Sequence, residues 1–150
     1  MMVAPPLLLA FAALICAGAV LSVQAPINSA LARGLGDPTL AACVSFLVGF
    51  LVMAIVCALR GVWPASGFAG QTPLWAWLGG SLGAFYITAL ILSVPLTGAL
   101  TAAAAAIFGQ LAMAMILDRF GAFGLPVQPI TWQRIAGLVL VMAGLLLSRA

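Results

Sequence analysis

The residues of this chain that could do chemistry are few, and most of them are uncharged. The 150 residues contain no histidine, glutamate or lysine, and Asp37 and Asp118 are the only acids. General acid–base catalysis and metal ligation draw on the missing residue types or on clustered acids. The sequence therefore predicts no catalytic residue, no metal site and no cofactor, and it argues against an enzyme.

The cysteines and arginines narrow the functional classes further. Cys16, Cys43 and Cys57 lie in apolar stretches without a CxxC pair, so we interpret them as small core residues rather than disulfide partners or ligands. The arginines are scattered, whereas nucleic-acid binding needs a clustered basic face. We therefore expect no nucleic-acid partner, and we expect the net charge of +3 to meet anionic lipid headgroups.

Four uncharged polar side chains are the candidate substrate-binding residues. At about 100° per residue, Gln24 and Asn28 share one face of the first apolar segment with small residues. Pro26 between them frees a backbone carbonyl, as in the broken helices of transporters. Tyr86 and Gln110 lie on small-residue faces of later segments. All four could line a polar cavity, or they could form hydrogen bonds that only hold helices together.

Three charged residues are candidates for interface or gating roles. Asp118 and Arg119 follow the fourth apolar segment, where they could cap a helix end, form a salt bridge or gate a pathway. Arg33 follows the first segment, and its closeness to Asn28 leaves room for contact with an anion. No acid lies at mid-membrane depth, so coupling through a central carboxylate is not supported.

Four glycines are predicted to pack helices. Gly79 and Gly83 form a GxxxG spacing, which allows close backbone contact between membrane helices. Gly137 and Gly144 lie seven residues apart in the last apolar segment, on a small-residue seam that also contains Val141. We interpret that seam as an interface with another helix or subunit.

The elements that must position these residues are membrane-spanning helices. Hydrophobic residues make up 66% of the chain and charged residues 5%, too few to cover the surface of a soluble fold. A span needs roughly 20 apolar residues to cross about 30 Å of hydrocarbon. The sequence predicts a single all-α domain over residues 1–150 with five transmembrane helices, at approximately residues 3–31, 39–59, 74–94, 99–117 and 132–148.

The connections and the N-terminus are also predicted. The segment from Gly61 to Pro73 is the longest connection, with Trp63 and Phe68 as interfacial anchors, whereas Pro95 to Gly98 is expected to be a very short turn. No basic residue precedes the first apolar run, which also outlasts the core of a signal peptide, so we expect no cleavage there.

The distribution of the arginines does not predict an orientation in the membrane. With five spans, Arg60, Arg119 and Arg134 fall on one side and Arg33 and Arg149 on the other. The positive-inside rule needs a clear excess of lysine and arginine on the cytoplasmic side. The chain could be oriented by other factors, or it could insert both ways. Two opposite copies would then form an antiparallel dimer of ten helices, with the inverted symmetry that many transporters have.

Six short blocks follow one another along the whole chain: QAPINSALAR (24–33), SFLVG (45–49), WLGGSLGAFY (77–86), GQ (109–110), LDRFG (117–121) and RIAG (134–137). In this order they resemble the bacterial YdcZ family, which is similar to the drug/metabolite transporter superfamily. The resemblance implies five helices per domain, an inner-membrane location and antiparallel two-domain assemblies with itself or a paralogue. The resemblance does not identify a substrate. The small multidrug resistance branch uses a glutamate in its first helix, which this chain lacks.

Two functions remain open from the sequence. The first is a small multi-pass transporter subunit of the bacterial inner membrane. It would move an unidentified small molecule by alternating access, as an antiparallel homodimer or with a paralogue. The second is a membrane accessory or scaffold subunit that does not transport. In that case the polar faces would meet other helices and enclose no cavity.

Overall fold

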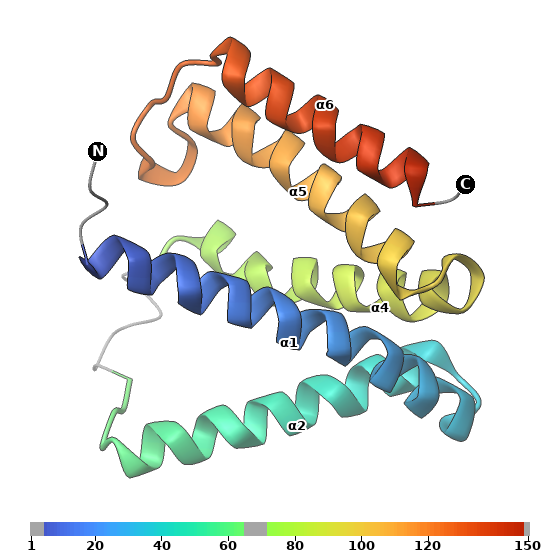
Figure 1. Ribbon diagram of the computed structural model, residues 1–150. Helices are drawn as coiled ribbons and strands as arrows, with labels where there is room; N and C mark the ends of the chain where they lie inside the picture. The colour runs from blue at the N-terminus through green and yellow to red at the C-terminus, as the bar shows by residue number, and fades with distance from the viewer. Residues whose placement is uncertain (1–4, 65–71, 149–150) are drawn as a thin grey trace. The chain divides into compact units, whose positions relative to one another are not determined.

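The computed structural model describes residues 5–64 and 72–148, and these residues form an all-helical chain (Figure 1), as predicted. By contacts the chain divides into two units, one ending at Pro95 and the other starting at Leu96. The anchor predicted at Phe68 and the arginine counted at position 149 lie outside the described residues. The helices are α1 (Pro5–Leu35), α2 (Pro38–Leu59), η1 (Leu74–Leu78), α4 (Gly79–Thr97), α5 (Ala99–Phe120), η2 (Ala122–Gly124) and α6 (Trp132–Leu147).

Helix α1 is longer than predicted and is not broken. It continues through Pro26 and past residue 31 to Leu35, so that Arg33 lies in its last turn. One proline removes a single helical hydrogen bond, and Ser and Thr side chains or neighbouring helices can replace it in a membrane protein. Gly36 follows the last residue of the helix, and its φ of +79° is a conformation that favours glycine.

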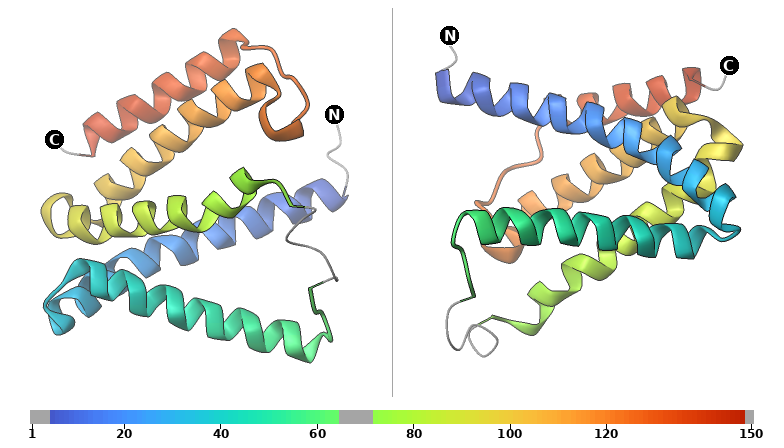
Figure 2. Two further views of the ribbon diagram at one scale, coloured as in Figure 1. Left: turned by 180° about the vertical axis from the view of Figure 1, so that it is seen from behind. Right: turned by 90° about the horizontal axis from the view of Figure 1, so that it is seen from below.

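Helices α1 and α2 form a hairpin that is close at the Gly36 turn and opens away from it (Figure 2). Asp37 starts α2, because its side chain accepts a hydrogen bond of 2.7 Å from the backbone N–H of Leu40. Pro38 occupies the first position of the helix, where a missing N–H costs nothing. The bounds of α2 agree with the predicted span over residues 39–59.

The third span is α4 together with a preceding 3₁₀ turn, and its end differs from the prediction. Pro95 lies inside α4, which continues to Thr97, so the short turn expected from Pro95 to Gly98 was wrong. Gly98 alone separates α4 from α5, and its φ is +78°. Proline fixes φ near the helical value and is tolerated close to a helix end, whereas glycine reaches the left-handed region that breaks the helix.

The second unit contains a hairpin of α5 and α6, which lie side by side (Figure 1). Thr101, near the start of α5, has its hydroxyl 3.3 Å from the hydroxyl of Ser148, just after α6. Gly121 ends α5 in the left-handed conformation, and Thr131 caps the start of α6 with a bond from the N–H of Arg134. Polar contacts therefore join the hairpin at the end opposite its loop.

Four helices among the described residues are long and apolar enough to cross a membrane, and α6 is a shorter apolar helix. Its 16 residues extend about 24 Å, against about 30 Å of hydrocarbon. The prediction of five helices is confirmed in number for the described part of the chain, but the last one is short for a full span. Its predicted range ended one residue later, at 148.

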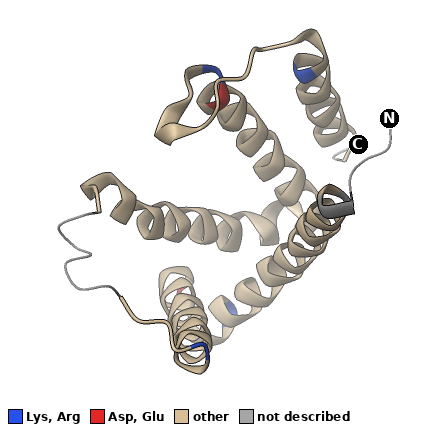
Figure 3. Ribbon diagram, turned by 90° about the vertical axis from the view of Figure 1, so that its left-hand side faces the viewer, with Lys and Arg blue, Asp and Glu red and all other residues tan. Residues whose placement is uncertain are grey.

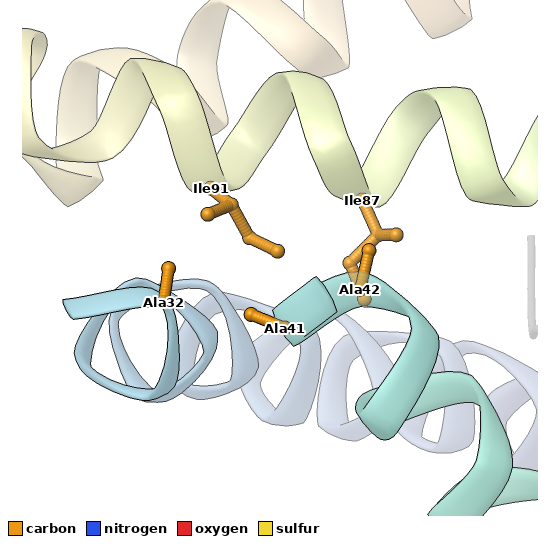
Figure 4. Packing of buried hydrophobic residues seen from close by; sticks show 5 residues of the cluster. All are labelled: Ala32, Ala41, Ala42, Ile87 and Ile91. Carbon is orange, nitrogen blue, oxygen red and sulfur yellow. The ribbon is translucent and has the colours of Figure 1, made fainter. Parts of the chain in front are cut away.

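The core is small, and most large apolar side chains are exposed on the single chain. Such a surface is expected where lipid or a partner covers it. The prediction that the cysteines are core residues was wrong for Cys16 and Cys43, which are exposed, while Cys57 is half-buried. Only a few residues of α1 and α2 are buried, and Cys16 and Cys43 are not among them. The buried apolar cluster of the first unit consists of Ala32, Ala41, Ala42, Ile87 and Ile91 (Figure 4).

Candidate substrate-binding site

One face of α1 is buried in the second half of the helix, and two of its residues are polar. Ala25, Asn28, Ser29 and Ala32 are all buried, at the i, i+3, i+4 and i+7 spacing of a single helix face. Ala32 packs in the cluster with residues of α2 and α4 (Figure 4). The two alanines are small, so they leave room for a neighbouring helix beside the two polar side chains.

Asn28 is the most unusual residue of this face. Its side chain is 3% exposed, and its amide nitrogen Nδ2 has no hydrogen-bond partner. Leaving a buried donor unpaired costs about 1–3 kcal/mol, and native structures rarely keep such a group without a reason. The amide therefore offers an unused pair of N–H donors among apolar neighbours.

Ser29, next to Asn28, connects α1 with α4. Its side chain is also 3% exposed, and its hydroxyl lies 3.1 Å from the carbonyl oxygen of Ala25 and 3.3 Å from that of Ile91. The first carbonyl belongs to the preceding turn of α1 and the second to α4. The bond to Ile91 is thus a polar contact between two helices in the first unit.

The other candidates from the sequence are less buried than Asn28. Gln24 lies one turn before Asn28 on α1, but its side chain is exposed. Tyr86 is half-buried on α4, next to the buried Ile87. Gln110 is exposed on α5 in the second unit. The structure brings Asn28 together with Ser29, and it leaves Gln24 and Gln110 on the surface of the single chain.

The charged candidates lie near helix ends, as Figure 3 shows. Asp118 in the last turn of α5 forms an ion pair of 3.0 Å with Arg134 of α6, with side chains 31% and 38% exposed. Arg119 is exposed beside it, and Arg33 is exposed at the end of α1. A groove of about 420 Å³ continues from the ion pair along α5 and α6, lined mainly by apolar side chains such as Leu111 and Val141.

The four glycines differ in their surroundings. A Cβ on Gly83 would lie 3.3 Å from the ring of Phe46, so the Phe46 side chain of α2 reaches the α4 backbone at this glycine. A Cβ on Gly79, Gly137 or Gly144 would have no heavy atom within 4 Å. These three positions therefore leave open space in the described part of the chain, where a partner could approach.

Three residues of the site region were missed by the sequence reasoning. Ser29 was passed over although it shares a face with Asn28 at adjacent positions, and Pro95 was placed in a turn. Arg134 was counted for the membrane orientation and quoted in a family block, but it was not identified as the partner of Asp118. A signal for Pro95 within a helix was present, because the apolar residues Val94 and Leu96 flank it and the glycine breaker comes only at Gly98. The pairing of Asp118 with Arg134 requires the fold, since 16 positions separate them.

Comparison with known proteins supports a membrane transport role. A family model described as "Putative inner membrane exporter, YdcZ" matches residues 9–147. No curated protein and no solved structure matches the chain. The matched region contains Asn28, Ser29 and the Asp118–Arg134 pair, and it includes four helices that are long and apolar enough to span a membrane. The chain is therefore a multi-pass membrane protein, and it belongs to the YdcZ family, whose model carries that inner membrane exporter description.

Proposed function

We propose that this chain is one subunit of an exporter that moves a small polar solute by alternating access, as an antiparallel pair. The observation that carries the proposal is the buried amide of Asn28, whose Nδ2 has no partner. An unpaired donor lowers the stability of the resting chain, and a solute that accepts a hydrogen bond from it would recover that cost. In an exporter, such a group is a binding site exposed in another conformation.

The donor chemistry of the site suggests the class of solute. Asn28 Nδ2 can only donate, so the solute must present an acceptor oxygen or nitrogen. Neither acid of the chain is free to hold a cation, because Asp37 caps α2 and Asp118 pairs with Arg134. We propose an uncharged or anionic solute rather than a cation.

An antiparallel pair would explain the exposed polar groups. Gln24 and Gln110 are exposed on a single chain, and amides in contact with lipid are costly. A second, inverted copy would place both amides against protein or in a cavity between the copies. The three-to-two distribution of the arginines is consistent with insertion in both orientations. The partner is a second copy or a paralogue.

The orientation is tested with reporters fused to the C-terminus. We expect an enzyme active only in the cytoplasm and an enzyme active only in the periplasm to report comparable activity from the same fusion site. Adding two lysines after Arg60 should bias the chain to one orientation. A single fixed orientation of the parent chain, with no partner of opposite orientation, would overturn the antiparallel arrangement.

The solute site is tested by flux from proteoliposomes, with Asn28→Leu beside the parent. Loss of one hydrogen bond to the solute predicts about tenfold slower flux. Ser22→Ala is the matched control, because the Ser22 hydroxyl bonds only the Gly18 carbonyl of its own helix, at an exposed position. Equal flux from the parent and Asn28→Leu would contradict the proposal.

A non-transporting accessory subunit is the second candidate. The observation in its favour is the bond from Ser29 to the α4 backbone, which is the kind of contact that holds helices together. In this case Asn28→Leu would leave the partners of the subunit and their activity unchanged, and purified chain in liposomes would move no solute.

A further inference from the structure

The carbonyl oxygen of Ile91 lacks its helical hydrogen bond. In an α-helix the N–H of residue i bonds the carbonyl of residue i−4, and proline has no N–H. Helix α4 continues through Pro95, so the carbonyl four residues earlier, that of Ile91, is left without this donor. The Ser29 hydroxyl lies 3.3 Å from that carbonyl oxygen and takes the place of the missing N–H.

The Ser29 hydroxyl has one proton and two acceptors within reach. Besides Ile91, the carbonyl oxygen of Ala25 lies 3.1 Å away, one turn earlier on α1. The hydroxyl can therefore turn from α4 to its own helix and remain hydrogen-bonded. When the contact between α1 and α4 opens, the Ile91 carbonyl loses its hydrogen-bond donor. The Ser29 hydroxyl stays paired, because it can still donate to the Ala25 carbonyl.

Opening this contact would expose two groups that need partners. Asn28 precedes Ser29 on the buried face of α1, and its Nδ2 is already unpaired. The Ile91 carbonyl would become an unpaired acceptor on the facing helix. A donor on α1 and an acceptor on α4 would then lie on the two sides of one opening.

We propose that the Asn28 amide and the Ile91 carbonyl bind an uncharged solute with a hydroxyl or amide group, and that Ser29 is the latch that covers this pair. A hydroxyl or an amide can accept from Nδ2 and donate to the carbonyl at the same time. A solute with acceptors only would satisfy one of the two groups. The inference rests on the proposed transport function and specifies its solute and its closed state.

The latch is tested by thiol labelling at position 28. Cys16, Cys43 and Cys57 are replaced by alanine, Asn28→Cys is introduced, and its reaction with a membrane-impermeant maleimide is followed. Losing an interhelical hydrogen bond should shift the opening equilibrium and raise the labelling rate about three- to tenfold in Ser29→Ala. Ser29→Thr keeps the hydroxyl and should label at the parent rate.

Two further variants make the labelling test specific to the latch. Ser22→Ala removes a serine of the same helix that bonds only its own helix, and it should not change the rate. Pro95→Ala returns an N–H to Ile91, so adding Ser29→Ala to it should change the rate little. Ser29→Ala labelling no faster than Ser22→Ala, or effects of Ser29→Ala and Pro95→Ala that simply multiply, would overturn the latch.

The solute pair is tested by thermal stabilisation of the detergent-solubilised parent chain. The probes are butane-1,4-diol, its dimethyl ether and tetraethylammonium. The diol should raise the melting temperature more than the ether, which cannot donate, and the cation should have no effect. The difference should disappear in Asn28→Leu. Equal shifts with diol and ether, or no shift with any probe, would overturn the assignment of the site.

The outcomes separate this inference from the proposed function. Absence of flux together with the labelling pattern and the diol preference would refute transport and leave the latched pair in place. Flux that depends on Asn28, with no effect of Ser29→Ala on labelling, would support transport and refute the latch.

Discussion

Replacing Asn28 with leucine should make the chain more stable and less active. The side chain is 3% exposed, its Nδ2 has no partner, and its neighbours on the same face are the buried Ala25 and Ala32. Leucine has the same forked end as asparagine, with methyl groups in place of the amide atoms, so it fits with little change of shape. The substitution removes an unpaired donor and buries apolar atoms instead.

The size of the effect follows from the cost of the unpaired donor. Leaving a buried polar group unsatisfied costs about 1–3 kcal/mol, and Asn28→Leu should recover that amount. For a chain of this length each kcal/mol corresponds to roughly 2–4 °C, which predicts an increase in melting temperature of roughly 2–12 °C. Flux should fall about tenfold in the same protein, since the hydrogen bond to the solute is lost.

The measurement is a thermal melt in detergent, followed by intrinsic tryptophan fluorescence. Gln24→Leu is the matched control, because it replaces an exposed amide one turn earlier on the same helix and should change the melting temperature little. A lower melting temperature for Asn28→Leu than for the parent would refute the reasoning. It would mean that the amide has a partner that holds the helices together.

Two other predictions concern the second unit. Gly121→Ala should lower the free energy of unfolding by about 1–3 kcal/mol, because φ is +59° there and a Cβ would lie 2.8 Å from Cγ2 of Val127. Gly124→Ala, at a φ of +81° with open space around the Cβ, should cost less, and thermal melts that rank the two the other way would contradict this. The partly exposed Asp118–Arg134 pair should contribute no more than about 1 kcal/mol of coupling in a double-mutant cycle of Asp118→Asn and Arg134→Gln. A coupling of several kcal/mol would show that the pair is shielded from solvent in the assembled protein.

Local chemistry made much of the fold predictable. The start of α2 could be placed within one residue, since the breakers before Thr39 are also the Asp37 cap and the Pro38 start. The position of Asn28 on a small-residue face could be predicted because helical periodicity is a local property. Asn28 is the one candidate amide that the structure buries, and no feature of the sequence alone distinguishes it from Gln24 or Gln110.

What could not be predicted depends on contacts between helices. A proline near the end of an apolar run is compatible with a turn or with the last turn of a helix, and for Pro95 the outcome is linked to the donor that Ser29 supplies from α1. The partner of Asp118 is on another helix, so charge spacing along the chain could not identify Arg134. Whether Gln24 and Gln110 meet a second chain is a property of an assembly, and the single sequence does not specify it.

The ion pair between α5 and α6 has a consequence for how the protein enters the membrane during synthesis. Helix α6 is short, and Arg134 lies in its first turn, so alone it is a weak candidate for insertion. The carboxylate of Asp118 neutralises that charge only when the end of α5 is beside it. We therefore expect the two helices to leave the insertion machinery together as a preformed hairpin, with α5 waiting until α6 has been translated.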